Sequence, residues 1–580
     1  MNNIDTTRSQ SRAPFLVLTE RQIVVILSLF IAIKVLIIFG YTLHREFIID
    51  EFSQAYKARL IGQFYDSYIP IKNVLYAYVY SIPAYFTENS VRITEFARYL
   101  SFAMMSVTLI VTYFAAMKLY HRRIFALFSV VVVLSVSSFT EHAFRIRSET
   151  VSIMFASIAC YVLLLSAGET RRVYKYDLGT GVLLGLAFLS TQKAVYYVLA
   201  LGFASLFCSM QVRQNLKSCV VMAAGFLITF LFYVLLLNPT DPLVVVSAIF
   251  KQPMDVALNA DNYYSSLAEY KVRSFYRNPI SYLIAALAII CGFIKWRGIS
   301  QPIRCVLVAL TIMLLLIYHH NQPWPYVFVM FMPLLGLMAV YPFYQRFILT
   351  TESSASSENG TYIPFVLAVL TLMLSAGFFR NVEYLQNDNM HQKELISIAE
   401  KQLLPNETYL DGAGMLVSRN RTAPHIGLDA MTSARVKADL DKGETKYLDQ
   451  LWAENPKIIL LNYRTLNLLD LMRGQVDQLY VALHPNIMVA GKCSESGDPI
   501  QYSNAWAGEY QIYTAGGVLH QDAPIVNEVP VAQKFRLQRG AFSIATTENK
   551  PFCIFPADLD WSDLHYPPQR PVRLFAHMYE

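Results

Sequence analysis

Charged residues are scarce in this sequence. Only 16% of its 580 residues are Asp, Glu, Lys or Arg, whereas 54% are hydrophobic, and soluble domains average about 25% charged. Up to about residue 380 the apolar residues form blocks of roughly 17 to 22, the length that crosses a bilayer core. From residue 381 the composition returns to that of an ordinary globular domain. The chain therefore divides into a membrane part, residues 1–380, and a folded domain, residues 381–580.

Several other features are absent. The net charge is only +6 and no basic stripe resembles a nucleic-acid surface, so we expect no nucleic-acid partner. No small-residue cleavage site follows the first apolar block, which we interpret as a retained helix. Seven cysteines are present, and Cys493 and Cys553 are the two in the C-terminal domain. They form a disulfide if that domain faces an oxidising compartment, and otherwise they are free thiols; the sequence leaves both open.

About eleven segments are long and apolar enough to be spans. They lie near residues 23–41, 97–118, 124–140, 149–167, 177–191, 193–210, 218–237, 279–295, 303–318, 325–343 and 362–379. With the N-terminus inside, every inner connection carries Lys or Arg, as the positive-inside rule requires. The outer side then holds the loops 42–96, 141–148, 238–278 and 319–324, and the C-terminal domain.

Within the first outer loop, residues 73–86 are apolar but form only a short stretch that contains Pro83. Counting it as a span would invert every later loop, so we interpret residues 44–95 as outer interfacial helices. In the C-terminal domain, residues 457–462 and 487–490 have the pattern of strands, and residues 390–404 that of a helix ending at Pro405. We therefore predict a polytopic α-helical membrane protein with a soluble α/β domain.

The same first outer loop contains the strongest chemical signal. Phe52, Tyr56, Leu60 and Phe64 recur at every fourth residue, which predicts an amphipathic helix on the outer membrane surface. Asp50 and Glu51 stand at its N-terminal end. Carboxylates close to an apolar boundary are often functional; the alternative is a helix-capping Asp50 and a solvated Glu51.

A second cluster, residues 139–149, joins two spans through a very short outer loop. Two arginines there, Arg145 and Arg147, run against the positive-inside trend and need compensation. A bound phosphate suits the guanidinium fork, and ion pairs with Glu141 or Glu149 are the alternative. Lys193 lies at the same level, where it either binds phosphate or extends its amine to the membrane surface.

A third outer connection, residues 319–326, brings His319, His320 and Trp324 to the same face. They are candidates for substrate binding, or members of an ordinary aromatic belt. Acids, bases and aromatics thus gather at one membrane face, as suits chemistry on a lipid-linked substrate. One carboxylate would take a proton from an acceptor hydroxyl, and Arg and Lys would hold a departing lipid phosphate. A single displacement would invert the anomeric configuration.

These motifs resemble the polytopic glycosyltransferases of the GT-C fold, in the branch of the protein O-mannosyltransferases and the lipid A aminoarabinose transferase. The similarity lies in Asp50-Glu51, Arg98-Tyr-Leu-Ser101, Arg145-Ile-Arg147-Ser-Glu149, Gly185 to Lys193, and Asn455 to Ile459 in the C-terminal domain. It implies Asp50 as catalytic base, Glu51 and Glu149 as supporting acids, and a sugar donor on polyprenyl phosphate.

The sequence departs from the family pattern in two places. A His- or Lys-Pro-Pro element is replaced by Ile69-Pro-Ile-Lys72, and Glu149 stands where Asp is common. Lys72 and Arg98 are further substrate-binding candidates. Some relatives bind a divalent metal ion near the acids and others need none, so a metal remains open.

The expected function is transfer of one hexose or pentose to a cell-envelope glycan, lipid or protein. The alternatives are a lipid-linked sugar flippase or transporter, which lacks support because no paired Gly/Pro-broken helices occur, and an enzyme that moves whole glycans. The acceptor-recognising Trp-Trp-Asp signature of the latter is absent. The expected location is a bacterial inner membrane, with the N-terminus cytoplasmic and the C-terminal domain periplasmic.

Overall fold

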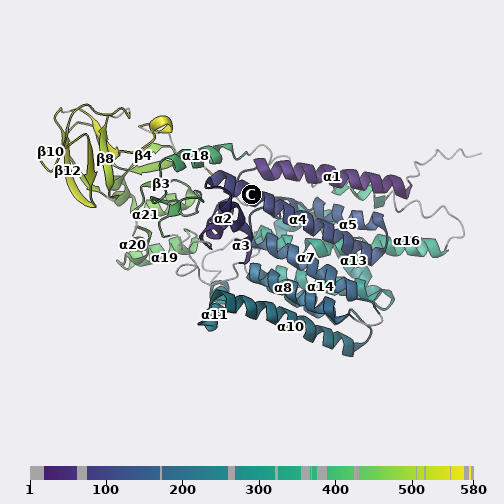
Figure 1. The fold of residues 1–580 in the computed structure, drawn as a ribbon. Helices are drawn as coiled ribbons and strands as arrows, with labels where there is room; N and C mark the ends of the chain where they lie inside the picture. The colour runs from purple at the N-terminus through teal and green to yellow at the C-terminus, as the bar shows by residue number, and fades with distance from the viewer. Residues whose placement is uncertain are drawn as a thin grey trace, which may run out of the picture.

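The computed structural model describes most of the chain. The described residues are 19–61, 75–169, 173–258, 268–320, 324–353, 363, 366–367, 369–371, 373–374, 388–566 without 424–427, 429, 453–454, 505, 515–516 and 549, and finally 574–575. Helices fill the first part of the chain, and strands with shorter helices fill the second (Figure 1).

The membrane part is a bundle of helices. Its helices are α1 (Glu20–His44), α2 (Ile49–Ile61), α3 (Leu75–Ser81), α4 (Ser90–Tyr120), α5 (Arg123–Ser135), α6 (Ser137–His142), α7 (Ser148–Ser166), α8 (Tyr174–Ser190), α9 (Val195–Ser205), α10 (Val212–Leu237), α11 (Pro242–Leu258), α12 (Ala268–Arg277), α13 (Pro279–Ile294), α14 (Gln301–Tyr318), α15 (Met332–Ala339) and α16 (Tyr341–Ser353). Short 3₁₀ turns at Ile82–Tyr85, Gln192–Ala194 and Pro325–Val329 join some of them.

Most of the predicted spans coincide with helices. Within the described residues, six helical stretches are long and apolar enough to cross a membrane, or seven if α12 and α13, bent by 92°, form one span. The other predicted spans appear as shorter helices, such as α5, α8 and α13, and most of the predicted span 362–379 lies outside the described residues. The chain is a multi-pass membrane protein; the count of about eleven spans stays a prediction.

Small residues let two of the helices approach closely. A Cβ atom on Gly181 of α8 would lie 2.0 Å from the carbonyl oxygen of Met222 in α10, and one on Gly225 would lie 2.4 Å from that of Leu178. Such backbone contact between helices is a common source of stability in membranes, where apolar side chains already meet apolar lipid. The helices α8 and α10 are thus closely packed, and Lys193 lies in the 3₁₀ turn that follows α8.

The C-terminal part contains three sheets. The first has the order β2-β1-β3-β5-β4 and consists of β1 (Thr408–Leu410), β2 (Asn420–Arg421), β3 (Ile458–Leu460), β4 (Tyr480–His484) and β5 (Ile487–Ala490). Its helices are α18 (Met390–Lys401), α19 (Ala430–Asp441), α20 (Lys446–Trp452) and α21 (Tyr463–Leu479). The predicted strands at 457–462 and 487–490 and the helix at 390–404 are confirmed as β3, β5 and α18.

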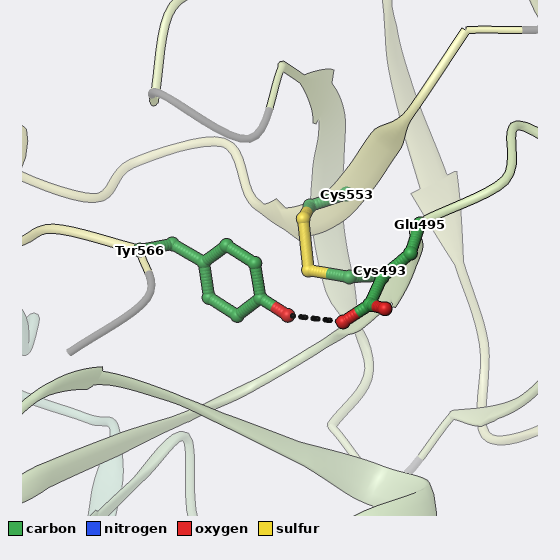
Figure 2. The surroundings of a disulfide bond; sticks show 4 residues. All are labelled: Cys493, Glu495, Cys553 and Tyr566. Atoms are coloured by element: carbon green, nitrogen blue, oxygen red, sulfur yellow. Dashed lines mark hydrogen bonds between the residues drawn. A yellow bond between two sulfur atoms is a disulfide. The ribbon is translucent and has the colours of Figure 1, made fainter.

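Two four-stranded antiparallel sheets follow, which the sequence analysis did not predict. Their orders are β10-β9-β12-β7 and β11-β8-β13-β6. The strands are β6 (Lys492–Ser494), β7 (Ile500–Asn504), β8 (Gly508–Tyr513), β9 (Pro524–Val526), β10 (Val529–Pro530), β11 (Lys534–Leu537), β12 (Gly540–Thr546) and β13 (Phe552–Pro556). Cys493 and Cys553, paired opposite each other on β6 and β13, form a disulfide, beside which Tyr566 donates a hydrogen bond to Glu495 (Figure 2).

Helix α2 lies between the bundle and the C-terminal part (Figure 1). Phe52 and Ala55 belong to the apolar core of the C-terminal part, whereas Ala58 and Ile61 belong to that of the bundle. The amphipathic pattern therefore predicted this helix correctly. The expectation that its apolar stripe lies on the membrane surface was wrong for the described residues Phe52 and Tyr56, because protein covers both.

Candidate active site

Side chains from the predicted outer loops contact one another. Asp50 meets Arg147, Lys193 meets Glu149, and Arg277 meets Glu141. Side chains from the predicted inner loops also contact one another, in the pairs Glu20–Arg122 and Lys118–Glu169. The second set lies at the far ends of two helices, because Glu20 begins α1 and Lys118 is in the last turn of α4. Which end faces the outside stays a prediction.

Asp50 is the partly exposed acid of this outer set. It lies in the first turn of α2, and its side chain is 27% exposed. Arg147 Nη1 lies 3.2 Å from its Oδ2, and Arg464 Nη2 lies 3.3 Å from its Oδ1. Each carboxylate oxygen therefore has its own guanidinium group, which favours the ionised form of the acid.

Arg147 joins Asp50 to a second acid. Its Nε lies 3.4 Å from Glu149 Oε2, while Lys193 Nζ lies 2.7 Å from Glu149 Oε1. Both cations lie close to the ring of Tyr326, whose centre is 3.4 Å from the Arg147 guanidinium carbon and 4.3 Å from Lys193 Nζ. Two cations thus lie against one aromatic ring, an arrangement that favours positive charge at this point.

Glu51 has a different environment from its neighbour. Its side chain is fully buried and lies 2.7 Å from Arg98 and 3.2 Å from Arg145, and it accepts hydrogen bonds from the N–H groups of Ile48 and Ile146. Burial alone would raise the pKa of Glu51, but the charges of the arginines outweigh it and hold this pKa far below its usual value. Glu51 therefore holds α2 against α4 and the loop before α7, out of reach of a substrate.

Arg98 does not fit its predicted role in substrate binding. The residue is 0% exposed, and all five of its N–H donors find acceptors: both oxygens of Glu51 and the carbonyls of Thr42, Arg45 and Glu46. Its guanidinium also lies 3.8 Å from the centre of the Phe47 ring. A side chain with no free donor and no exposure positions the loop between α1 and α2.

The remaining predicted residues lie apart from Asp50 or outside the described residues. Lys72 is among the residues that the structure does not describe. His319 is exposed, whereas His320 Nδ1 lies 2.7 Å from the hydroxyl of Tyr196, which is in the first turn of α9, just after Lys193. Trp324 stacks on Tyr326, with ring centres 6.4 Å apart. His320 and Trp324 thus adjoin the Lys193–Tyr326 side of the cluster.

Arg464 and Tyr326 were missed as members of this site. Arg464 lies 414 residues from Asp50 in the sequence, and no local pattern links the two. Its place at the start of α21, just beyond the connection that follows β3, was the available signal, because binding and catalytic residues often lie on such connections. For Tyr326 the signal was its aromatic ring at the predicted outer level.

No group of three or more His, Cys, Asp or Glu side chains suited to a metal ion occurs among the described residues. The acids of this cluster are instead surrounded by guanidinium and ammonium groups. The described side chains thus offer cations for an anionic ligand.

Part of the chain matches a known protein family. Residues 80–237 match the family model described as dolichyl-phosphate-mannose-protein mannosyltransferase, a range that includes Arg145, Arg147, Glu149 and Lys193. The search of curated proteins found no match.

Solved structures share the fold at low identity. ArnT from Cupriavidus metallidurans, bound to undecaprenyl phosphate, is 13% identical with a TM-score of 0.54, over 80% of this chain and 97% of that one. The archaeal oligosaccharyltransferase AglB from Archaeoglobus fulgidus, solved with an inhibitory peptide and a dolichol-phosphate, is 9% identical with a TM-score of 0.51, over 96% of this chain and 99% of that one.

The chain is thus a polytopic membrane protein with the GT-C fold and a soluble C-terminal part. Over residues 80–237 the chain is similar to a family of mannosyltransferases, which agrees with the resemblance that the sequence motifs indicated.

Proposed function

We propose that this protein transfers a single sugar from a polyprenyl-phosphate carrier to an acceptor at the outer face of a cell membrane. The observation that supports this most is the pairing of a partly exposed acid with cations. Asp50 lies 3.2 Å from Arg147, and Lys193 lies 2.7 Å from Glu149 in the same cluster. A base for a hydroxyl group and cations for a phosphate are the groups that such a transfer needs.

In the proposed reaction Asp50 acts as the general base. Its carboxylate takes the proton of the acceptor hydroxyl, and the acceptor oxygen forms a bond to the anomeric carbon. The bond from that carbon to the phosphate oxygen breaks as the new bond forms, and its electron pair leaves with the polyprenyl phosphate. One displacement of this kind inverts the anomeric configuration.

Arg147 and Lys193 are the proposed ligands of the departing phosphate. Their side chains are 6% and 24% exposed, and both now pair with carboxylates that a phosphate would replace. Arg145, which is also a predicted phosphate ligand, pairs with buried Glu51 and donates to the carbonyl of Glu141. We therefore assign Arg145 a supporting position and give the phosphate to Arg147 and Lys193.

Low dielectric near the membrane strengthens these charge interactions. The donor chain would lie among the helices, and the acceptor would approach from the side of the C-terminal part. We propose the cell inner membrane as the location, with the N-terminus in the cytoplasm and the C-terminal part outside. The acceptor class is a cell-envelope glycan, lipid or protein.

The test incubates purified protein with radiolabelled polyprenyl-phosphate sugars and membrane extract. We expect transfer from at least one donor, and a loss of about 100-fold or more in Asp50→Asn, the usual contribution of a general base. Asp498→Asn, at an acid in an exposed loop of the C-terminal part, is the matched control and should retain full activity. Undiminished transfer in folded Asp50→Asn would remove Asp50 as the base.

Whole-glycan transfer is the second candidate, because the fold similarity extends to an oligosaccharyltransferase. Diphosphate-linked oligosaccharides in the same assay separate the two activities. Transfer from them alone would replace the single-sugar proposal. For the phosphate site, Arg147→Glu should weaken binding of undecaprenyl phosphate, while Arg536→Glu on an exposed position of β11 should not.

A further inference from the structure

The C-terminal part supplies a cation to the candidate active site. Arg464 is the second residue of α21, and Asn462, the residue before that helix, accepts hydrogen bonds from the N–H groups of Arg464 at 2.9 Å and Thr465 at 3.3 Å. The amide of Asn462 also donates to the carbonyl of Asp411 at 2.7 Å. These bonds fix the first turn of α21 and therefore the backbone from which Arg464 extends.

The C-terminal part is itself fixed to α2, the helix that carries Asp50. The side chain of Gln392 pairs with both the N–H and the carbonyl of Phe47, at 2.7 and 3.0 Å. At the other end of α2, Arg59 donates to the carbonyls of Val417 and Arg419, at 3.0 and 2.7 Å. Bonds at both ends of the helix thus set where Arg464 lies relative to Asp50.

The two cations on Asp50 are not equivalent. Arg147 forms ion pairs with both Asp50 and Glu149 and is a proposed ligand of the donor phosphate. Arg464 comes from outside the bundle, and its side chain is 13% exposed. When Arg147 binds phosphate, the contact between Arg464 and Asp50 remains and keeps this carboxylate oriented.

We propose that Arg464 is a positioning residue of the active site, which holds the Asp50 carboxylate through Oδ1 and makes sugar transfer depend on docking of the C-terminal part. This inference rests on the proposed function of Asp50 as the base. It goes beyond that function because it assigns the soluble part a direct share in the reaction centre.

Other charged and titratable groups face this acid and its partners. Arg147 reaches Asp50 from the loop before α7, with Glu149 and Lys193 behind it. Tyr463 of α21 is also within electrostatic reach. Tyr76 of α3 is close enough to Glu149 to sense its charge. Glu51, next to Asp50 in α2, faces Arg98 and Arg145 instead.

The test compares Arg464→Gln, Arg464→Lys and Arg536→Gln, the last on an exposed position of β11 as the matched control. Removing a cation from beside a carboxylate makes protonation easier, so the acidic limb of the pH–rate profile should move up by about one pH unit in Arg464→Gln. We expect a lower kcat, unchanged affinity for undecaprenyl phosphate, partial recovery in Arg464→Lys, and no change in Arg536→Gln.

A second measurement does not need transfer. Water-soluble carbodiimide modifies protonated carboxyl groups, and mass spectrometry of the peptide that contains Asp50 follows its modification against pH. In Arg464→Gln, the carbodiimide should still react with Asp50 at a pH about one unit higher than in the wild-type protein. A pH dependence identical in both proteins would overturn the inference even if no donor supports transfer.

The outcomes separate the two proposals. If folded Asp50→Asn keeps full transfer, the proposed base fails. If Asp50→Asn is inactive but the acidic limb of Arg464→Gln stays in place, the base stands and the role of Arg464 is refuted. A loss of undecaprenyl phosphate affinity in Arg464→Gln equal to that in Arg147→Gln would also refute it, because Arg464 would then be a phosphate ligand.

Discussion

Replacing Glu51 by glutamine tests the buried charge network that supports the site. Glu51 contacts both Arg98, at 2.7 Å, and Arg145, at 3.2 Å. It accepts five hydrogen bonds in all, from Arg98 Nε and Nη2, Arg145 Nη1 and the N–H groups of Ile48 and Ile146. Glutamine is neutral, and its amide nitrogen cannot accept, so donors on one side lose their partner.

The size of the effect follows from burial. Glu51 and Arg98 both have fully buried side chains, and breaking a buried ion pair by removing one partner costs about 3–5 kcal/mol. Glu169→Gln is the matched control, because the Glu169–Lys118 pair is 3.4 Å long with a 52% exposed carboxylate. Such a surface pair contributes about 0–1 kcal/mol.

Denaturant-induced unfolding in detergent micelles, followed by tryptophan fluorescence, measures both variants. Acid provides an independent arm. Since the folded-state pKa of Glu51 lies far below its usual value, its contribution is complete above the unfolded value of about 4.3 and is lost as pH falls below it. Glu51→Gln should lack that share of the acid sensitivity. A variant within about 1 kcal/mol of the unmodified protein, with the same acid sensitivity, would refute the charge-network argument.

Three further predictions concern stability. Burial, with a smaller effect of nearby Lys193 and Lys271, lowers the pKa of His320 from 6.5 to about 4. The unfolded chain therefore binds a proton first, and the folded protein should lose stability as the pH falls from 6.5 to about 4. In His320→Asn the melting temperature should depend less on pH over this range, and an equal dependence in both proteins would contradict the prediction. Gly414 has φ +91°, and a Cβ atom there would lie 2.5 Å from Tyr56. Gly414→Ala should therefore destabilise the docking of the C-terminal part on α2 by about 1–3 kcal/mol. The control Gly443→Ala, where a Cβ atom would meet no atom within 4 Å, should cost less, and similar losses in both variants would exclude a clash. Cys493→Ser opens a loop of 60 residues and should cost about 2–4 kcal/mol, whereas an unchanged melting temperature would show that the bond adds nothing.

Much of the fold could be predicted because it depends on local pattern. The predicted spans 149–167 and 303–318 coincide with α7 and α14 to within two residues, since the length of an apolar run is itself the requirement for crossing a bilayer. β5 matches its predicted residues because a short β-branched run between turn signals strongly favours a strand. The spacing of four residues between Phe52 and Tyr56 likewise indicated a helix, because it is a local pattern.

What covers each face was decided by tertiary structure alone. The spacing of Phe52 and Tyr56 cannot distinguish lipid from a protein core, since both accept apolar side chains equally well. Asp50 and Glu51 are neighbours in the sequence, yet one is partly exposed between Arg147 and Arg464 and the other is buried against Arg98. Successive residues on a helix point about 100° apart, so partners that lie far away in the sequence determine which acid is left for chemistry.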